Sequence, residues 1–156
     1  MKRRSFLKGL AATAPLAVVA TPMTLSAKDA KPKGPNTLDL KTAMDTITGG
    51  KGAKESDKIK LTVPEIAENG AVVPIKIEVD NPMEEANYVK SIHVIATKNS
   101  NVRCADVMLT PLNDIGYFAT RIKLGTSQDV MALVGLSNGD FIKVQKPVKV
   151  TIGGCG

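Results

Sequence analysis

The sequence contains one histidine, two cysteines and no tryptophan, and only 3% of its residues are aromatic. A single histidine, with no Cys-x-x-Cys motif and no His-x-x-x-His spacing, does not supply the ligand pattern of a zinc or haem site. The sequence also lacks a nucleophile elbow and a glycine-rich phosphate loop followed by lysine. Composition alone does not exclude a Ser-His-Asp triad, but no motif supports one. The sequence therefore predicts no metal, no cofactor and no catalytic residue.

Two short features that resemble functional motifs have simpler interpretations. His93 lies between Ile92 and Val94 in an alternating run, so we expect a partly exposed residue on the polar side of a strand. The segment Gly49-Gly50-Lys51-Gly52 resembles a phosphate loop but lacks the preceding strand and following helix. We interpret it as the turn that ends a helix.

The first 27 residues have the pattern of an export signal. Paired arginines, Arg3-Arg4, precede Phe6-Leu7-Lys8, and a mildly apolar run extends from residue 9 to residue 21. This arrangement matches the twin-arginine signal, which directs folded proteins across the bacterial inner membrane. The apolar run is too short to span a bilayer. We expect cleavage near Ala27, with Ala20 as the alternative site, a periplasmic location and no membrane anchor after cleavage.

This signal accounts for most of the positive charge. The whole chain has 21 basic and 15 acidic residues, a formal net charge of +6. Residues 1–27 contain four basic residues and no acidic ones, so 17 basic and 15 acidic residues remain after cleavage. Such a nearly balanced charge does not indicate binding to nucleic acid or to a membrane surface.

After the signal, the sequence predicts a linker and one short helix. Residues 28–35 are rich in lysine, proline and glycine, which is typical of a mobile linker. Asn36 is the expected N-cap of the helix, and Gly49-Gly50 are expected to end it. The apolar residues between them recur at helical spacing, at Leu40, Ala43, Met44 and Ile47. We expect this apolar stripe to pack on the domain or on a partner.

From residue 58 the apolar period changes to two, which predicts strands. Pro74 indicates a strand start or an edge position, and Asn138-Gly139 indicates a type I′ hairpin turn. Frequent turns separate seven or eight expected strands, at 59–63, 73–79, 92–96, 104–109, 116–124, 130–136, 141–144 and 148–152. The fold class that we predict for residues 36–152 is mainly β: an immunoglobulin-like antiparallel β-sandwich with one short N-terminal helix and a flexible C-terminal arm.

The two cysteines stand in very different surroundings. Cys155 follows Gly153-Gly154 and precedes Gly156, and glycine leaves the backbone free and unobstructed. We therefore predict that residues 153–156 form a slim flexible arm with an exposed thiol. Cys104 lies in a strand-like run, where a cysteine commonly acts as a small buried hydrophobe. Because export permits disulfides, a binding or structural module with a Cys104–Cys155 disulfide remains the alternative.

The position of Cys155 favours a carrier over a catalyst. A nucleophilic enzyme holds its nucleophile near a general base and an oxyanion site, and the sequence around Cys155 provides neither. A thiol redox enzyme would need a resolving cysteine or a general base. A thiol without a site of its own, on an arm that reaches other proteins, is typical of a covalent carrier.

Several segments of the chain resemble the SoxY family, the carrier subunits of the bacterial sulfur-oxidising (Sox) system. The resemblance covers nearly all of the sequence after residue 27, and the combination of the Glu-Asn-Gly segment, the terminal motif and the twin-arginine signal is specific. The matching segments are Pro64–Pro74, Asn81–Met83, Tyr88–Ile92, Thr120–Leu124 and Val150–Gly156. One departure is the single glycine after Cys155, where the family often has two.

This resemblance implies a function and a set of partners. It implies that the protein forms a heterodimer with a smaller β-sandwich subunit, SoxZ, and that Cys155 carries sulfur intermediates covalently. A haem enzyme, SoxAX, would join thiosulfate oxidatively to the thiol, giving a cysteine S-thiosulfonate. A hydrolase, SoxB, would release sulfate, and a sulfane dehydrogenase or another acceptor would take the remaining sulfur. A related carrier that serves a different sulfur pathway stays open as an alternative within the family.

Overall fold

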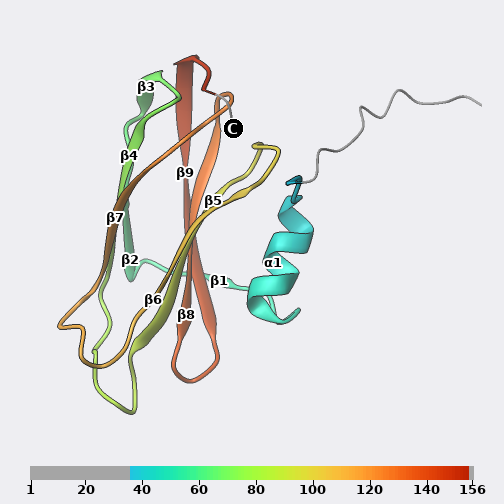
Figure 1. Cartoon of the computed structure of the whole chain (residues 1–156). Helices are drawn as coiled ribbons and strands as arrows, with labels where there is room; N and C mark the ends of the chain where they lie inside the picture. The colour runs from blue at the N-terminus through green and yellow to red at the C-terminus, as the bar shows by residue number, and fades with distance from the viewer. Residues whose placement is uncertain (1–35, 155–156) are drawn as a thin grey trace, which may run out of the picture. The chain divides into compact units, whose positions relative to one another are not determined.

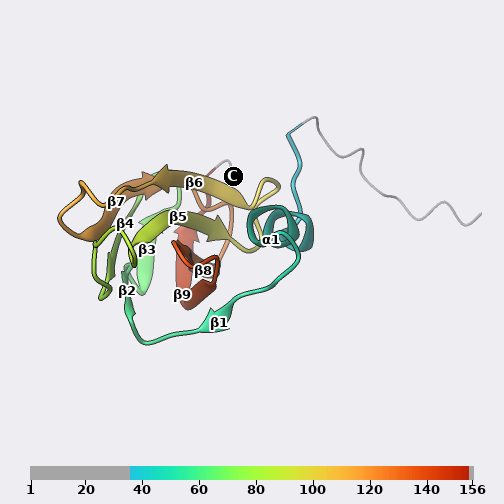
Figure 2. The same cartoon turned by 90° about the horizontal axis from the view of Figure 1, so that it is seen from below.

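The computed structural model describes residues 36–154 as a β-sandwich with one helix on its outer face (Figures 1 and 2). The larger sheet has the strand order β1-β9-β8-β5-β6, with β3 also paired to β9, and the smaller sheet has the order β2-β4-β7. The helix is α1 (Leu40–Thr48), and the strands are β1 (Lys54–Glu55), β2 (Ile59–Thr62), β3 (Ile66–Asn69), β4 (Val73–Val79), β5 (Val89–Ala96), β6 (Arg103–Met108), β7 (Gly116–Ile122), β8 (Gln128–Leu136) and β9 (Phe141–Ile152).

Alternating residues place the main core between the two sheets. In β4 the apolar residues Val73, Ile75 and Ile77 are almost completely buried, while Pro74 is exposed. From the larger sheet, Ile92, Val94 and Val130 face them in the same cluster. Burying one such aliphatic side chain contributes about 1.5–3 kcal/mol, so this cluster is the main source of stability. The mainly-β sandwich predicted from the sequence is confirmed.

A second, smaller core joins α1 to the outer face of the larger sheet (Figure 2). Ala43 is fully buried, and Leu40, Met44 and Ile47 of the same stripe are partly buried. Their partners are Ile95, Met131 and Leu133 of the sheet and Val102, which precedes β6. The apolar stripe of the helix is therefore covered by the protein's own sheet. The stripe therefore packs on the domain, not on a partner. It is not available as a binding surface for another subunit.

The helix begins three residues later than the sequence predicted. Asp39, not Asn36, is the N-cap, and its Oδ1 accepts a hydrogen bond of 3.0 Å from the backbone N–H of Thr42. A carboxylate at this position also interacts favourably with the helix dipole. At the other end, Gly49 adopts a left-handed conformation with φ of 62°, as expected for a glycine that ends a helix.

Two prolines mark places where a strand has a neighbour on one side only. Pro74 lies in β4, the middle strand of its sheet, but β2 ends opposite Lys76 and does not reach it. Pro147 lies in β9 between the stretch that pairs with β1 and the stretch that pairs with β3. Proline has no backbone N–H to donate, so it fits where the strand has no neighbour on one side. The sequence predicted two strands around Pro147, and the structure has one continuous strand.

The pairings of β9 also depart from a purely antiparallel sandwich. Both β1 and β3, which the sequence did not predict, pair with β9 in parallel. The Asn138-Gly139 hairpin forms between β8 and β9, but only Gly139 has a positive φ, of 88°. A type I′ turn needs positive φ at both central residues, so that turn type was wrong. Among residues 36–154, no helix is long and apolar enough to cross a bilayer.

Candidate functional site

Of the residues predicted to form the arm, the structure describes Gly153 and Gly154. Cys155 and Gly156 lie outside the described residues, as do the predicted signal of residues 1–27 and the linker of residues 28–35. Gly153 and Gly154 directly follow β9, at the end of the sandwich where β3 ends and β7 leads toward β8 (Figure 1). This end of the domain is therefore the one that adjoins Cys155.

Three chain segments are connected here by backbone hydrogen bonds. The N–H of Gly70 donates to the carbonyl oxygen of Ile152 at 2.7 Å, and the N–H of Leu124 donates to the carbonyl oxygen of Gly70 at 2.7 Å. The N–H of Gly154 then donates to the carbonyl oxygen of Leu124 at 3.0 Å. The bonds form a series that links the Gly70 segment, the turn after β7 and the base of the arm. We call this set of contacts the glycine junction.

The glycines of this junction are required because the backbones approach closely. A Cβ atom on Gly70 would lie 2.2 Å from the Leu124 carbonyl oxygen and 2.8 Å from the Gly154 nitrogen. A Cβ on Gly154 would lie 2.6 Å from the nitrogen of Ala71, and one on Gly153 would lie 2.4 Å from the carbonyl oxygen of Gly125. The sequence suggested freedom of movement as the reason for Gly153 and Gly154. The structure gives another reason, which is space for neighbouring main chain.

Side chains hold the turn that receives Gly154. Asn99 accepts a hydrogen bond from the N–H of Gly125 at 3.1 Å and donates one to the carbonyl oxygen of Lys123 at 2.8 Å. Gln128, only 4% exposed, donates to the Asn99 carbonyl oxygen at 2.8 Å. Ser127 accepts from the N–H of Val150 at 2.9 Å, which fixes the end of β9 to the same region. Sequence reasoning missed these supporting residues because they are distant along the chain.

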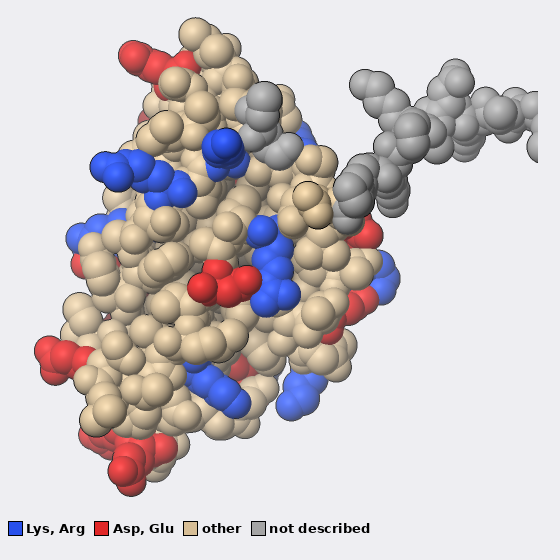
Figure 3. Space-filling view, in the orientation of Figure 1, with Lys and Arg blue, Asp and Glu red and all other residues tan. Residues whose placement is uncertain are grey.

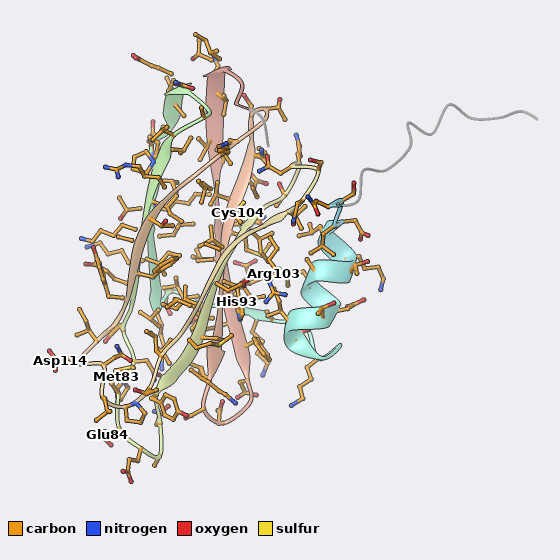
Figure 4. The ribbon with its side chains drawn as sticks, in the orientation of Figure 1. Met83, Glu84, His93, Arg103, Cys104 and Asp114 are labelled. Carbon is orange, nitrogen blue, oxygen red and sulfur yellow. The ribbon has the colours of Figure 1, made fainter. Side chains whose placement is uncertain are left out.

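Cys104 lies in the domain as a free, half-buried thiol (Figure 4). It packs against the main core, and its Sγ donates a weak hydrogen bond to the carbonyl oxygen of Val102 at 3.6 Å. Burial raises the pKa of the Cys104 thiol above its ordinary value, so little of it is in the reactive thiolate form. The expected small hydrophobe is thus found, with Cys104 as a free thiol. Cys155, its partner in the alternative disulfide, lies outside the described residues.

On the side of the larger sheet that faces α1, polar side chains form a hydrogen-bonded chain that the sequence did not predict (Figure 4). His93 is 4% exposed, not partly exposed as expected, and its Nδ1 donates to the carboxylate of Asp106. Its Nε2 lies 3.0 Å from the hydroxyl oxygen of Ser91, and Arg103 donates to the other Asp106 oxygen at 2.8 Å. Cross-strand pairing of His93 with Asp106 positions the two side chains.

Three residues of this hydrogen-bonded group, Ser91, His93 and Arg103, line a cavity of about 380 Å³ between α1 and the sheet. Ile47 and Phe141 are among its other walls. Figure 3 shows acidic and basic side chains in contact at the middle of this face, where Figure 4 labels Arg103. Burial acts to raise the pKa of Asp106, but the hydrogen bonds from His93 and Arg103 outweigh it and hold the pKa below its ordinary value.

The order Ser91–His93–Asp106 is that of a catalytic triad, but a nucleophile also needs oxyanion donors. Ser91 lies in β5, which is hydrogen-bonded to β6 on one side and to β8 on the other, so the backbone N–H groups around it are committed to the sheet. We interpret the chain as a structural link between β5 and β6. Among the described residues, no group of three His, Cys, Asp or Glu side chains is arranged to hold a metal ion.

Comparison with known proteins defines the class. The family profile of the sulfur oxidation protein SoxY matches residues 44–155, a segment that contains most of the described domain and Cys155. The chain is therefore a sulfur carrier protein of the sulfur-oxidising system and works with the other proteins of that system, rather than being an enzyme. It belongs to the SoxY family.

Solved structures agree with this assignment. The sulfur carrier protein SoxY from Chlorobium limicola f thiosulfatophilum is 25% identical, with a TM-score of 0.62, and the match covers 73% of this chain and 97% of that one. A superoxide reductase from Ignicoccus hospitalis is 18% identical, with a TM-score of 0.54, over 60% of this chain and 80% of that one. A putative superoxide reductase from Thermotoga maritima, 15% identical with a TM-score of 0.55, covers 63% of this chain and 93% of its own. The two reductases share the fold alone. No curated protein sequence matches the chain significantly.

Proposed function

We propose that Cys155 is the point at which sulfur intermediates are covalently attached during thiosulfate oxidation. The observation that supports this most is that the SoxY match runs through Cys155, while the other cysteine, Cys104, is half-buried in the core. A carrier needs a thiol that partner enzymes can reach, and burial disfavours the Cys104 thiolate. No cofactor is needed beyond the sulfur group itself.

The proposed chemistry follows from the carrier role. A SoxAX-like haem oxidase removes two electrons and the thiol proton as the sulfur of Cys155 bonds to the terminal sulfur of thiosulfate, which gives the cysteine S-thiosulfonate. A SoxB-like hydrolase then uses one water to cleave the bond between sulfane sulfur and sulfonate, which releases sulfate and leaves a persulfide. A sulfane dehydrogenase or another acceptor takes up the remaining sulfur. Each of these enzymes would dock on the carrier transiently.

The protein also pairs, in this proposal, with a SoxZ-like subunit as a heterodimer. Because α1 already covers its own sheet, we place this subunit on the surface of residues 108–117, which we call the β6–β7 surface. It holds four exposed apolar side chains, and Leu112 is 97% exposed. The four are Met108, Leu112, Ile115 and Tyr117. Four exposed apolar side chains in one short segment are unusual for a surface that remains in contact with water.

Charge and position indicate what the partner must look like. Exposed Asp114 belongs to the β6–β7 surface, and exposed Glu84, followed by exposed Glu85, lies beside it. Figure 4 labels Glu84 and Asp114 at the lower end, where Figure 3 shows acidic side chains gathered. The matching partner surface is an apolar pocket with a lysine and arginine rim. The seven residues of β4 separate this end from the glycine junction by about 20 Å, so such a partner leaves the arm accessible.

The proposed location is the periplasm, reached by the twin-arginine route. The support comes from the sequence, where Arg3-Arg4 and Phe6-Leu7-Lys8 precede a short apolar run. A fusion of residues 1–35 to a reporter that is active only after export in the folded state tests this proposal. Export should stop when both arginines are replaced by lysine, and continued export of that variant would contradict the route.

The carrier role is tested by intact mass measurement. The purified heterodimer is incubated with thiosulfate and the haem oxidase, and a mass increase of one thiosulfate group is expected. Cys104→Ser is the matched control, which should gain the same mass because its thiol lies in the core. Cys155→Ser should gain none. An adduct that persists in Cys155→Ser, or that requires Cys104, would overturn the assignment.

A further inference from the structure

The glycine junction has a geometry that a simple tether for a swinging cysteine does not require. We propose that the Gly70-Ala71 segment and the Leu124-Gly125 turn form a docking site for Gly153-Gly154, which holds the base of the arm against the domain and must open before Cys155 reaches deeply into a partner. The inference rests on the proposed carrier function of Cys155. Gly70 and Asn99 are then positioning residues for that cysteine.

The two sides of the glycine junction fit closely against each other. A Cβ on Gly154 would lie 2.6 Å from both the nitrogen of Ala71 and the carbonyl carbon of Gly70. A Cβ on Gly70 would meet the Gly154 nitrogen at 2.8 Å. Because both contacts are with main chain, no side-chain movement can relieve them. Neither glycine has a positive φ, so backbone conformation does not explain the residue type. Close packing does.

The turn that receives Gly154 is held by side chains that do not belong to the arm. Asn99 bonds to the N–H of Gly125 and to the carbonyl oxygen of Lys123, on either side of Leu124, which leaves the Leu124 carbonyl aimed at Gly154. Gln128 is 4% exposed, and its side-chain amide donates to the side-chain oxygen of Asn99 and to the main-chain carbonyl oxygen of Thr126. A buried polar network of this kind fixes a turn in one conformation.

The docking site also limits how far Cys155 can extend from the domain. While the Gly154 N–H is bonded to Leu124, the Cα of Cys155 lies within about 3.8 Å of the Cα of Gly154, the fixed spacing of neighbouring residues. If the chain detaches as far back as Ile152, three extended residues give Cys155 a radius of about 10–11 Å. The docking site therefore sets how far the thiol extends from the domain. One hydrogen bond and a few contacts hold it, so a partner can open it.

The test uses the full protein after signal removal and needs neither thiosulfate nor an enzyme. Cys155 is alkylated with a small reagent, iodoacetamide, and with a bulky one, a maleimide on a 5-kDa polyethylene glycol chain, in a Cys104→Ser background. In Gly154→Ala and Asn99→Ala the ratio of bulky to small rates should rise about two- to tenfold, the population change that one hydrogen bond corresponds to. Gly139→Ala is the control for general destabilisation, because Gly139 lies in the β8–β9 hairpin with φ of 88°.

A second measurement keeps the idea testable if Gly154→Ala folds poorly. Amide hydrogen exchange should show the Gly154 N–H protected in the unmodified protein and unprotected in Asn99→Ala, which retains every glycine. An unprotected Gly154 amide in the unmodified protein would overturn the docking site, and so would alkylation ratios equal to that of Gly139→Ala. Neither result depends on whether Cys155 binds thiosulfate, so failure of the carrier function would be seen separately, by mass.

Discussion

Replacing His93 by alanine tests whether the polar chain beneath α1 stabilises the domain. The ring is 4% exposed and bonded through Nδ1 to Asp106 and through Nε2 to Ser91. Alanine leaves the Ser91 hydroxyl, in a residue only 7% exposed, without its ring partner, at a cost of about 1–3 kcal/mol. Asp106 is partly exposed and still accepts the hydrogen bond from Arg103, so losing its bond to His93 costs less, about 0.5–1 kcal/mol. We expect the free energy of unfolding to fall by about 1.5–4 kcal/mol.

Urea unfolding followed by far-ultraviolet circular dichroism measures this loss, since the protein has no tryptophan for fluorescence. With a denaturant slope of about 2 kcal/mol/M, the midpoint should fall by about 1–2 M. Lys90→Ala is the control, because Lys90 is an exposed residue on the same strand and its loss should cost about 0.5 kcal/mol or less. A His93→Ala protein as stable as Lys90→Ala would refute the structural role assigned to the chain.

Three further predictions concern the reactivity of the Cys104 thiol, the loss of stability at low pH and the proposed partner surface. In Cys155→Ser, iodoacetamide should modify Cys104 at least about tenfold more slowly in the native protein than in urea, because burial raises its pKa; equal rates would show an exposed thiol. The pKa of Asp106 is lower in the folded than in the unfolded state, so its stabilisation is present above about pH 4 and is lost as the pH falls through the folded pKa. Between pH 3 and pH 6, the urea midpoint should therefore fall less steeply with decreasing pH in Asp106→Asn than in the unmodified protein. Parallel curves for the two proteins would contradict the link between the ionisation of Asp106 and stability. Leu112→Asp should weaken binding of the SoxZ-like subunit, measured by calorimetry, by about 10-fold or more, while Val72→Asp at the other end of the sandwich should not; similar affinities for both variants would place the partner elsewhere.

The periodic parts of the sequence were sufficient to predict the sandwich. Alternation from Val73 to Val79 predicted β4, and the nearly continuous apolar run from residue 130 to residue 136 predicted β8, which lies between β9 and β5. Helical spacing likewise predicted α1, although Asp39 rather than Asn36 caps it. These elements follow from local pattern because each buries one regular face.

The features that the sequence did not predict depend on residues that are distant along the chain. Residues 54–55 and 66–69 are too short and too polar to show a period, and they become strands only because β9 offers them an edge. The burial of His93 depends on Asp106 in a neighbouring strand and on the helix that covers it. Gly70 was visible as part of a motif, but its role depends on Leu124 and Gly154, which no local pattern connects to it. The roles predicted for Cys155 and Gly156 stay predictions.

The way β9 is held has a mechanical consequence if partner enzymes draw Cys155 into their sites, as proposed. Any pull on Cys155 that opens the glycine junction is transmitted along β9, which is paired with β8 from Phe141 to Val148 by hydrogen bonds perpendicular to the strand. Such a pull loads these bonds together, in shear, instead of separating them one at a time. The parallel strand β3 adds pairs at Lys149, Val150 and Ile152, next to the point where the force enters. The pairing of β9 with β8 and β3 would therefore keep the sheet intact while the proposed arm is extended.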